Sequence, residues 1–238
     1  VSNGGSVVER VELPVGTALD LSAYVTEREG YDFTGWYLDA ALTQPITSLT
    51  LEADTTVYAG WRIRNPFVDV AEKDYFYDAV LWGVENGVVK GMDETHFEPE
   101  TVCTRAQALT FLWRANGMPQ PKTTTNPFVD VDASAYYYDA VLWGVENGIV
   151  KGMDETHFEP DTACSRAQAL TFLWRAKGMP QASGTTFADV PANAYYAQAV
   201  AWGVENGIVK GMDETHFEPD TLCQRAHAVT FLWRAYAN

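Results

Sequence analysis

The chain is poor in positive charge. Its 238 residues contain 16 Lys and Arg against 32 Asp and Glu, which gives a formal net charge of −16. Nucleic acids and anionic membrane surfaces bind clustered basic residues, and the sequence has no such cluster. Long apolar runs are also missing, because none approaches the roughly 20 residues that span a bilayer. We therefore expect neither a nucleic-acid partner nor membrane insertion.

Cysteine is scarce as well. The three cysteines, Cys103, Cys164 and Cys223, show no C-x-x-C spacing, and three equivalent thiols cannot all pair within one chain. We expect small buried apolar residues; the alternative, a three-thiolate metal site on a pseudo-threefold axis, has no support from ligand spacing. No cofactor is expected. The sequence shows no signal peptide and starts at Val1, so we expect an excised or processed piece whose export signal, if any, is not shown.

What the sequence does contain is an internal repeat with a period near 60 residues. The segment Phe-x-Asp-Val begins at Phe67, Phe128 and Phe187. A unit of this length is one helical hairpin with a generous loop, and a single hairpin cannot bury both of its helices. We therefore expect the three copies to share one core in a compact pseudo-threefold assembly. An extended helical solenoid is the structural alternative.

Two helices are predicted in each copy. In the first copy, residues 75–85 carry apolar side chains on more than one face, and Gly87 is typical of a left-handed cap that ends a helix. A turn-rich connection follows at residues 88–99. The second helix is predicted from Arg105 to Ala115, with Gly117 as its stop.

The start of the second helix carries the candidate binding residues. Thr104 and Gln107 are spaced as a capping box, in which the hydroxyl and the amide each bind a backbone N–H of the first turn. Arg105 then stands at the first helical position, where the helix dipole disfavours a cation by up to about 1 kcal/mol. Free N–H groups and a guanidinium fork that point the same way predict a site for a carboxylate or phosphate. The alternative is that each arginine pairs with a nearby acidic residue.

This arrangement recurs with one departure. The second copy keeps the box with Ser165 and Gln168. In the third copy, Gln224 and His227 replace the cap and its partner, so we expect that helix start to be less stable by about 1 kcal/mol. We also expect the third site to be weakened or differently selective. The three motif arginines are Arg105, Arg166 and Arg225.

Residues 1–62 are predicted to form a separate small β-rich unit. Apolar and polar residues alternate in 7–13, and aromatic residues alternate with small ones in 30–37 and 54–61. We expect these aromatics in a core, in a spacer whose binding role is undefined. The signatures Asn-Gly-Gly, Gly-Tyr-x-Phe-x-Gly-Trp-Tyr and Tyr-Ala-x-Trp resemble the internalin-type B-repeat, or Listeria–Bacteroides repeat. That resemblance implies a β-grasp-like fold strung along bacterial surface proteins.

Each later copy reads Phe-x-Asp-Val, an Ala-Val-x-Trp helix, Gly-Ile/Val-Val-x-Gly, Phe-x-Pro and then Thr-Arg-Ala-Gln or a variant of it. This series resembles the S-layer homology (SLH) domain in three tandem copies. The resemblance implies a pseudo-trimer around a central three-helix bundle, with grooves between modules that bind secondary cell-wall polymer non-covalently. In well-known members the polymer ends in a pyruvylated N-acetylmannosamine, whose carboxylate the motif arginine holds.

The resemblance assigns further residues to the implied grooves. Gly91, Gly152 and Gly211 match the groove glycines, where a side chain would block the sugar. Asp69 and its equivalents match the family's Phe-x-Asp, although a turn or cap role explains them equally well. Gln107 and Gln168 take the place of the family's usual acidic residue in the arginine motif, so they keep the capping box without its charge.

We therefore predict a mainly α fold with a small N-terminal β-grasp-like domain. The helical-hairpin modules are predicted at residues 65–119, 126–180 and 185–238. The predicted function is non-covalent anchoring of a Gram-positive surface protein, outside the cell, to cell-wall glycan, either a secondary polymer or peptidoglycan. The chain is expected to be a monomer with an internal pseudo-trimer and no enzymatic activity.

Two other functions compete with this prediction. The loop that holds Asp93, Glu94, His96 and Glu98 recurs in each copy and could bind a metal or carry out acid–base chemistry. Solvent-facing turn residues anchored by the adjacent Phe97 are the simpler interpretation, and three copies without a unique partner residue argue against catalysis. A protein–protein adhesion or assembly scaffold, with the arginines in salt bridges, is the other alternative.

Overall fold

The computed structural model describes residues 1–184 and 187–237. Thr185 and Thr186, where the third module was predicted to begin, and Asn238 lie outside the described residues. The chain divides into two compact units, Val1–Asn65 and Pro66–Asn238. Each unit is described by itself.

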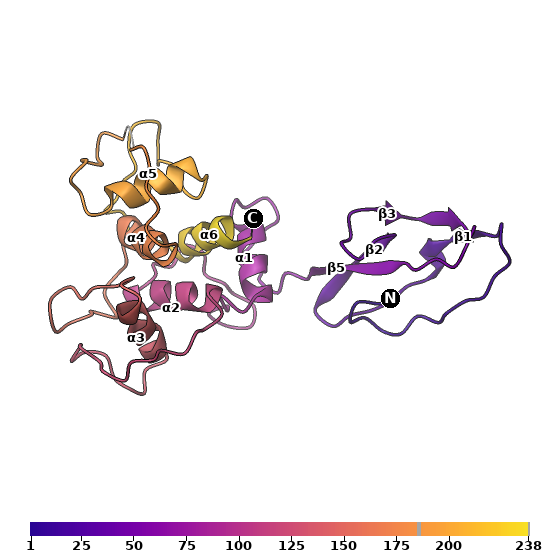
Figure 1. The fold of residues 1–238 in the computed structure, drawn as a ribbon, viewed down its shortest axis with the longest axis horizontal. Coiled ribbons are helices and arrows are strands. Elements are labelled where there is room, and N and C mark those ends of the chain that lie inside the picture. Colours follow the sequence, from indigo (N-terminus) through magenta and orange to yellow (C-terminus); the bar gives the residue numbers. More distant parts are fainter. Residues whose placement is uncertain (185–186, 238) are drawn as a thin grey trace. The chain divides into compact units, whose positions relative to one another are not determined.

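The N-terminal unit consists of two small antiparallel sheets. Strand β2 lies between β3 and β5 in a three-stranded sheet, and β1 pairs with β4 (Figure 1). One 3₁₀ helix, η1 (Leu21–Ala23), follows β1. The strands are β1 (Ala18–Asp20), β2 (Tyr31–Tyr37), β3 (Pro45–Ile46), β4 (Ser48–Thr50) and β5 (Tyr58–Ile63).

The core of this unit is built on Trp36, which is buried with Leu21 and Ala59. Its indole N–H donates to the carbonyl oxygen of Tyr24 at 2.8 Å, so the polar atom of the ring is satisfied inside the core. The aromatic alternation in 30–37 and 54–61 therefore predicted strands with a buried face correctly. The alternation in 7–13 did not, because this segment forms no strand and leaves Val7 almost fully exposed.

The C-terminal unit is helical, with one short and one long helix in each copy. The long helix begins at Arg105 and ends at Ala115, as predicted. The short helix begins at Tyr77, later than predicted, because a turn that joins the Tyr77 N–H to the carbonyl of Asp74 precedes it. The helices are α1 (Tyr77–Glu85), α2 (Arg105–Ala115), α3 (Tyr138–Glu146), α4 (Arg166–Ala176), α5 (Ala197–Glu205) and α6 (Arg225–Tyr236).

The long helices α2, α4 and α6 pack against one another, and each short helix packs mainly on a long helix of another copy. Helix α3 lies on α2, α5 lies on α4, and α1, from the first copy, lies on α6, from the last (Figure 1). The predicted hairpin therefore does not close within a copy. Sharing of one core among the copies is confirmed, since a single cluster of buried side chains includes residues from all of them.

The three cysteines lie where the copies meet. The backbone N–H of Cys103 donates to the carbonyl of Cys223, that of Cys164 to Cys103, and that of Cys223 to Cys164. All three side chains are fully buried, and burial raises the pKa of Cys103 and of Cys164 to about 12. The prediction of buried apolar residues is thus confirmed. No cluster suited to hold a metal occurs among the residues that the structure describes.

The helix starts follow the capping pattern read from the sequence. Thr104 and Ser165 each form a complete capping box with Gln107 and Gln168. In α6 the cap residue is Gln224, whose side chain makes no capping hydrogen bond. The first turn of α6 therefore lacks a side-chain acceptor that its two equivalents have.

We predict opposite effects of substitutions at the two kinds of cap. Ser165→Ala should lower the free energy of unfolding by about 1 kcal/mol, because a first-turn N–H loses its acceptor. Gln224→Ser should raise it by a smaller amount, since serine supplies the acceptor that α6 lacks. Urea unfolding followed by the helical circular dichroism signal measures both changes, with Thr124→Ala in the linker as the neutral control. A loss of stability in Gln224→Ser would contradict the capping argument.

Candidate functional site

The motif arginines lie at the junctions between copies, where each one reaches into the loop of the next copy. Arg105 donates from Nε to the carbonyl oxygen of Phe158 at 2.9 Å and from Nη2 to that of Lys151 at 3.4 Å. Arg166 makes the same pair of bonds to Phe217 and Lys210, and Arg225 to Phe97 and Lys90. The contacts thus run from copy 1 to copy 2, from 2 to 3, and from 3 to 1. We name these places the Arg105, Arg166 and Arg225 junctions.

A carboxylate stands behind each of these carbonyls. Asp130 accepts hydrogen bonds from the backbone N–H of Phe158 at 2.9 Å and of Glu159 at 2.7 Å. The peptide group between Phe158 and Glu159 therefore joins Arg105 to Asp130, since its C=O accepts from the guanidinium and its N–H donates to the carboxylate. Asp189 and Asp69 hold the corresponding peptides of the other two junctions. The turn role weighed for these aspartates is the one that the structure displays.

The arginines are buried, and none of them forms an ion pair with a described residue. Their exposed fractions are 2% for Arg105 and 3% for Arg166 and Arg225. The salt bridges of the described residues include none of the three. Burial lowers the pKa of Arg105, while nearby acidic groups, among them Asp130, oppose that shift. Direct pairing with an acidic residue, the alternative raised by the sequence, is therefore replaced by a carboxylate that acts through a peptide group.

Each guanidinium also packs on aromatic rings and keeps one nitrogen unused. The Cζ of Arg105 lies 4.8 Å from the ring centre of Phe158 and 5.6 Å from that of Phe172, a distance at which a cation is attracted to the ring. In none of the three does Nη1 hydrogen-bond to any described residue, and it is not among the fully buried atoms without a partner. This nitrogen is therefore the donor of the motif that the described residues leave unbonded.

The glycines carried over from the family serve the loops themselves. A Cβ built on Gly152 would stand 2.1 Å from the carbonyl oxygen of Asp154 and 2.7 Å from a ring carbon of Phe128. Gly91 and Gly211 meet their own loops in the same way. A side chain at these positions would displace the loop that offers its carbonyls to an arginine. These contacts account for glycine without reference to a sugar.

Sequence reasoning missed an exposed tyrosine at each junction. Burial raises the pKa of Tyr195, and the charge of Arg105 counteracts that shift. The charge of Arg166 acts on the pKa of Tyr75 in the same way. Tyr136 interacts with Arg225, whose pKa it raises against the effect of burial. All three rings are more than half exposed, and each packs edge-on against the next aromatic residue. The recurrence of this tyrosine ahead of each short helix was the available signal.

Each junction therefore draws on all three copies. The Arg105 junction combines an arginine from the first copy, a loop from the second and Tyr195 from the third. Gln168 also belongs to it, because its Nε2 lies 3.9 Å from Sδ of Met153 in that loop. His227 of the third copy interacts with Arg166 and with Tyr75. The departure in the third copy thus lies in the Arg166 junction rather than beside Arg225.

The acidic loops are internally satisfied turns. In the second copy, Asp154 accepts from the backbone N–H of Thr156 at 2.7 Å and of His157 at 2.8 Å, and it pairs with the His157 imidazole at 2.9 Å. Hydrogen bonds from Thr156 and His157 lower the pKa of Asp154 to about 2. Phe158 anchors the loop and is fully buried. A carboxylate that is this acidic is a poor general base near neutral pH.

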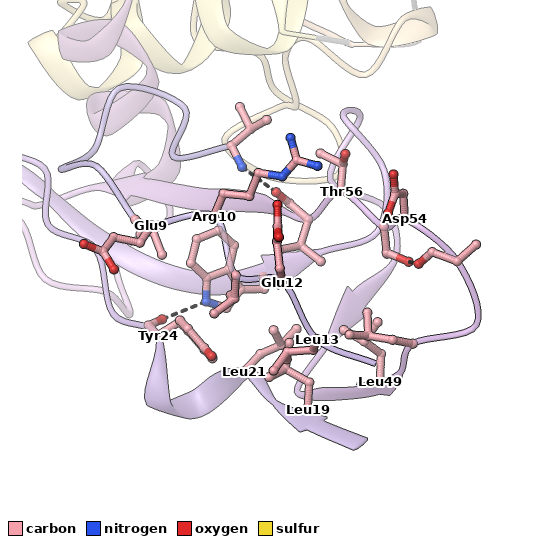
Figure 2. A pocket seen from close by; sticks show the side chains of 18 of the residues that line it. Glu9, Arg10, Glu12, Leu13, Leu19, Leu21, Tyr24, Leu49, Asp54 and Thr56 are labelled. Carbon is pink, nitrogen blue, oxygen red and sulfur yellow. Dashed lines mark hydrogen bonds between the residues drawn. The ribbon is translucent and has the colours of Figure 1, made fainter. Parts of the chain in front are cut away.

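The N-terminal unit contains a cavity. It has a volume of about 720 Å³ and lies between the irregular segment 7–13 and the sheets. Figure 2 shows an apolar side with Leu19, Leu21 and Leu49, and charged residues at the other side, among them Glu9 and Glu12. None of the residues predicted to bind a ligand lines this cavity.

The S-layer homology domain family matches residues 66–109, 127–170 and 186–229, more than half of the chain. The chain belongs to the S-layer homology family. The Listeria–Bacteroides repeat domain matches residues 1–60, so the resemblance read from the N-terminal signatures is confirmed as well. The match of all three segments agrees with the three copies seen in the sequence and in the helices.

Relatives of this SLH chain are surface-layer proteins and some enzymes. It is 31% identical over 163 residues to the Surface-layer 125 kDa protein of Lysinibacillus sphaericus. This alignment covers 66% of this chain and 14% of the relative. It is 28% identical to an S-layer protein of Bacillus thuringiensis subsp. finitimus, over 70% of this chain and 21% of the relative. An amylopullulanase of Thermoanaerobacterium thermosulfurigenes is 25% identical, over 74% of this chain and 10% of the relative.

The chain spans about a tenth to a fifth of the length of these relatives. The family and the surface-layer relatives indicate a cell-wall, surface-exposed location for the SLH chain. No helix within the part of the chain that the structure describes is long and apolar enough to cross a membrane.

We predict that Asp130→Asn weakens the Arg105 junction. The amide cannot accept both backbone N–H groups, and the charge that faces the buried arginine through the peptide is lost. The free energy of unfolding should fall by about 1.5–3 kcal/mol, the range for hydrogen bonds to charged groups. Asp132→Asn, at an exposed turn of the same copy, is the control and should change it by less than about 1 kcal/mol. Equal effects in urea unfolding would contradict the role of Asp130.

The acidic loops predict a dependence of stability on pH. The pKa of Asp154 is lowered in the folded state, so its contribution to stability is complete above the pKa of the unfolded chain and is lost as the pH falls through about 2. Stability measured by urea unfolding should therefore fall between pH 4 and pH 2, and Asp154→Asn should reduce that fall. Glu155→Gln, an exposed neighbour, is the control. An identical fall in Asp154→Asn and the wild type would refute the assignment.

Proposed function

We propose that the C-terminal unit of this SLH chain anchors its parent surface protein non-covalently to the cell wall by binding an anionic secondary cell-wall polysaccharide. Membership of the SLH family supports the anchoring role. The observation that supports an anionic ligand is the arginine at each junction, whose Nη1 makes no hydrogen bond to the described residues and lies beside a helix start. A carboxylate is the group that such a nitrogen and the helix dipole favour together.

Arg105, Arg166 and Arg225 are proposed as the anion-binding residues. We propose two further groups of residues as parts of the same sites. Gly91, Gly152 and Gly211 belong to them because they shape the loops. Gln107 and Gln168 belong to them because they cap the helix starts. The exposed tyrosines add rings of the kind that stack on the apolar faces of sugars. A pyruvylated sugar fits this arrangement because its carboxylate and its ring offer both groups.

We also propose that the copies form a pseudo-threefold assembly, with modules at residues 65–119, 126–180 and 185–238 after an N-terminal domain at 1–62. The cyclic order of the arginine contacts and of the hydrogen bonds between the cysteines supports it. On this proposal the chain is a monomer that contains an internal trimer. A solenoid would leave its first and last copies apart, whereas here α1 packs on α6.

The unit itself is proposed to be non-catalytic, although the relatives include an amylopullulanase and an exoglucanase. The parts of those enzymes that match this chain are small fractions of their length. The acidic loops offer no unique partner residue and carry carboxyls of low pKa. The alternative function is a protein–protein scaffold on the cell surface that binds no glycan.

A sacculus-binding experiment tests the proposed function. The chain should sediment with sacculi from a Gram-positive wall. Acid extraction of the secondary polymer should reduce this binding by about tenfold, which corresponds to about 1.4 kcal/mol of binding free energy. The triple variant Arg105→Ala, Arg166→Ala, Arg225→Ala should also lose binding. Binding that survives extraction would favour peptidoglycan or a protein partner.

The arginine variant needs a check, because each arginine also joins two copies. Its helical circular dichroism and unfolding transition must match those of the wild type for its loss of binding to count. Replacement of Tyr75, Tyr136 and Tyr195 by alanine supplies a second variant, since these side chains are more than half exposed. If the folded tyrosine variant binds sacculi as tightly as the wild type, and if extraction of the secondary polymer does not change binding, the proposed glycan binding is wrong. The protein–protein scaffold would then be the favoured function.

A further inference from the structure

His227 gives the Arg166 junction a side chain that the other two junctions do not have. The equivalent residues are Gln107 and Gln168. The His227 ring lies between Tyr75 and Phe231, with ring centres 6.3 Å and 6.4 Å away and interplanar angles of 29° and 11°. Because Tyr75 is an exposed ring, the imidazole stands directly behind a surface of this junction that a ligand can reach.

The chemistry of the two side chains differs. The Oε1 of Gln168 accepts from the backbone N–H of Ser165 at 3.0 Å, so the amide is occupied by the helix cap and carries no charge at any pH. His227 caps nothing, since α6 has no side-chain cap. Its Nδ1 is buried and makes no hydrogen bond, the one such side-chain atom among the residues that the structure describes. The imidazole therefore retains an unsatisfied group that can change protonation.

A single positive charge, that of Arg166, acts on this imidazole. Burial and then the charge of Arg166 lower the pKa of His227 to about 4. The other titratable groups at the junction are Tyr75, ahead of α1, and the two that interact with Tyr75, Arg234 on α6 and Cys223. Two carboxylates face Arg166 from the loop of the third copy: Glu218, whose charge acts on the guanidinium, and Asp189, which holds the Phe217–Glu218 peptide. No carboxylate of the described residues forms an ion pair with His227. A bound anion beside Arg166 would oppose the effect of the Arg166 charge on this imidazole.

We propose that His227 determines the selectivity of the Arg166 junction by taking up a proton when an anionic ligand binds beside Arg166, so that this junction alone binds more tightly as the pH falls. This inference rests on the proposed function. The bound anion offsets the Arg166 charge and attracts the imidazolium, so it raises the pKa of His227 in the complex. Binding linked to proton uptake strengthens below that raised pKa. Gln107 and Gln168 provide no such group.

The loop histidines do not produce the same difference. His96, His157 and His216 each pair with the aspartate three residues earlier, in the same geometry in every copy. These pairs are therefore a feature that the three junctions have in common. A comparison of the wild type with His227→Gln removes their contribution, because the substitution restores the residue found in the other two copies.

Nuclear magnetic resonance on the full chain tests this inference, with the histidines labelled at Cε1 and the His227 signal assigned from His227→Gln. The probe is the methyl glycoside of pyruvylated N-acetylmannosamine. The pKa of His227 should rise by about one unit at saturation, which corresponds to a limiting tenfold gain in affinity. With a free pKa of about 4, the gain between pH 7 and pH 4.5 is roughly threefold.

The variants separate the possible outcomes. His227→Gln should lose the pH dependence at the Arg166 junction, and Gln168→His should introduce it at the Arg105 junction. A pKa of His227 that does not move at saturation, or a pH dependence that persists in His227→Gln, overturns this inference and leaves the proposed function standing. No binding of the probe at any pH overturns the pyruvylated form of the proposed function and this inference with it.

Discussion

The C-terminal unit depends on a buried cation that is neutralised through a peptide group. An isolated guanidinium inside a protein is costly unless its charge is balanced and its donors are satisfied. Here one peptide does both at each junction, as between Arg105 and Asp130, where the C=O of Phe158 faces the arginine and the next N–H faces the carboxylate. Because arginine and carboxylate belong to neighbouring copies, the charge balance itself holds the copies together.

On the proposed function, this arrangement gives the motif arginine two roles at once. Two of its nitrogens donate to backbone carbonyls, and the third, which makes no hydrogen bond to the described residues, is the proposed donor to a ligand. A guanidinium that its own loop already fixes loses little freedom when it binds an anion, and pre-organisation of this kind favours affinity. On this proposal, loss of a motif arginine affects folding and binding together, because the same side chain joins two copies and meets the ligand.

Local signals in the sequence predicted local structure well. The capping boxes at Thr104 and Ser165, the extent of α2 and the buried cysteines all follow from residue types and their spacing. The partners across copies could not be predicted, because a repeat of near-identical units is compatible with packing on either neighbour. For the same reason His227 was assigned to the third site, whereas its side chain lies beside Arg166. In the segment 7–13 a local signal failed, because alternation of apolar and polar residues does not produce a strand where no other strand pairs with it.

The packing of α1 on α6 has a consequence for how the unit assembles. The first short helix finds its partner in the last long helix of the chain, and Arg225 closes the ring on the loop of the first copy. Contacts between residues so far apart in sequence form only after the intervening chain is available, and they slow folding. When the chain is synthesised or exported from its N-terminus, the core around α1 therefore becomes complete only after α6 has emerged.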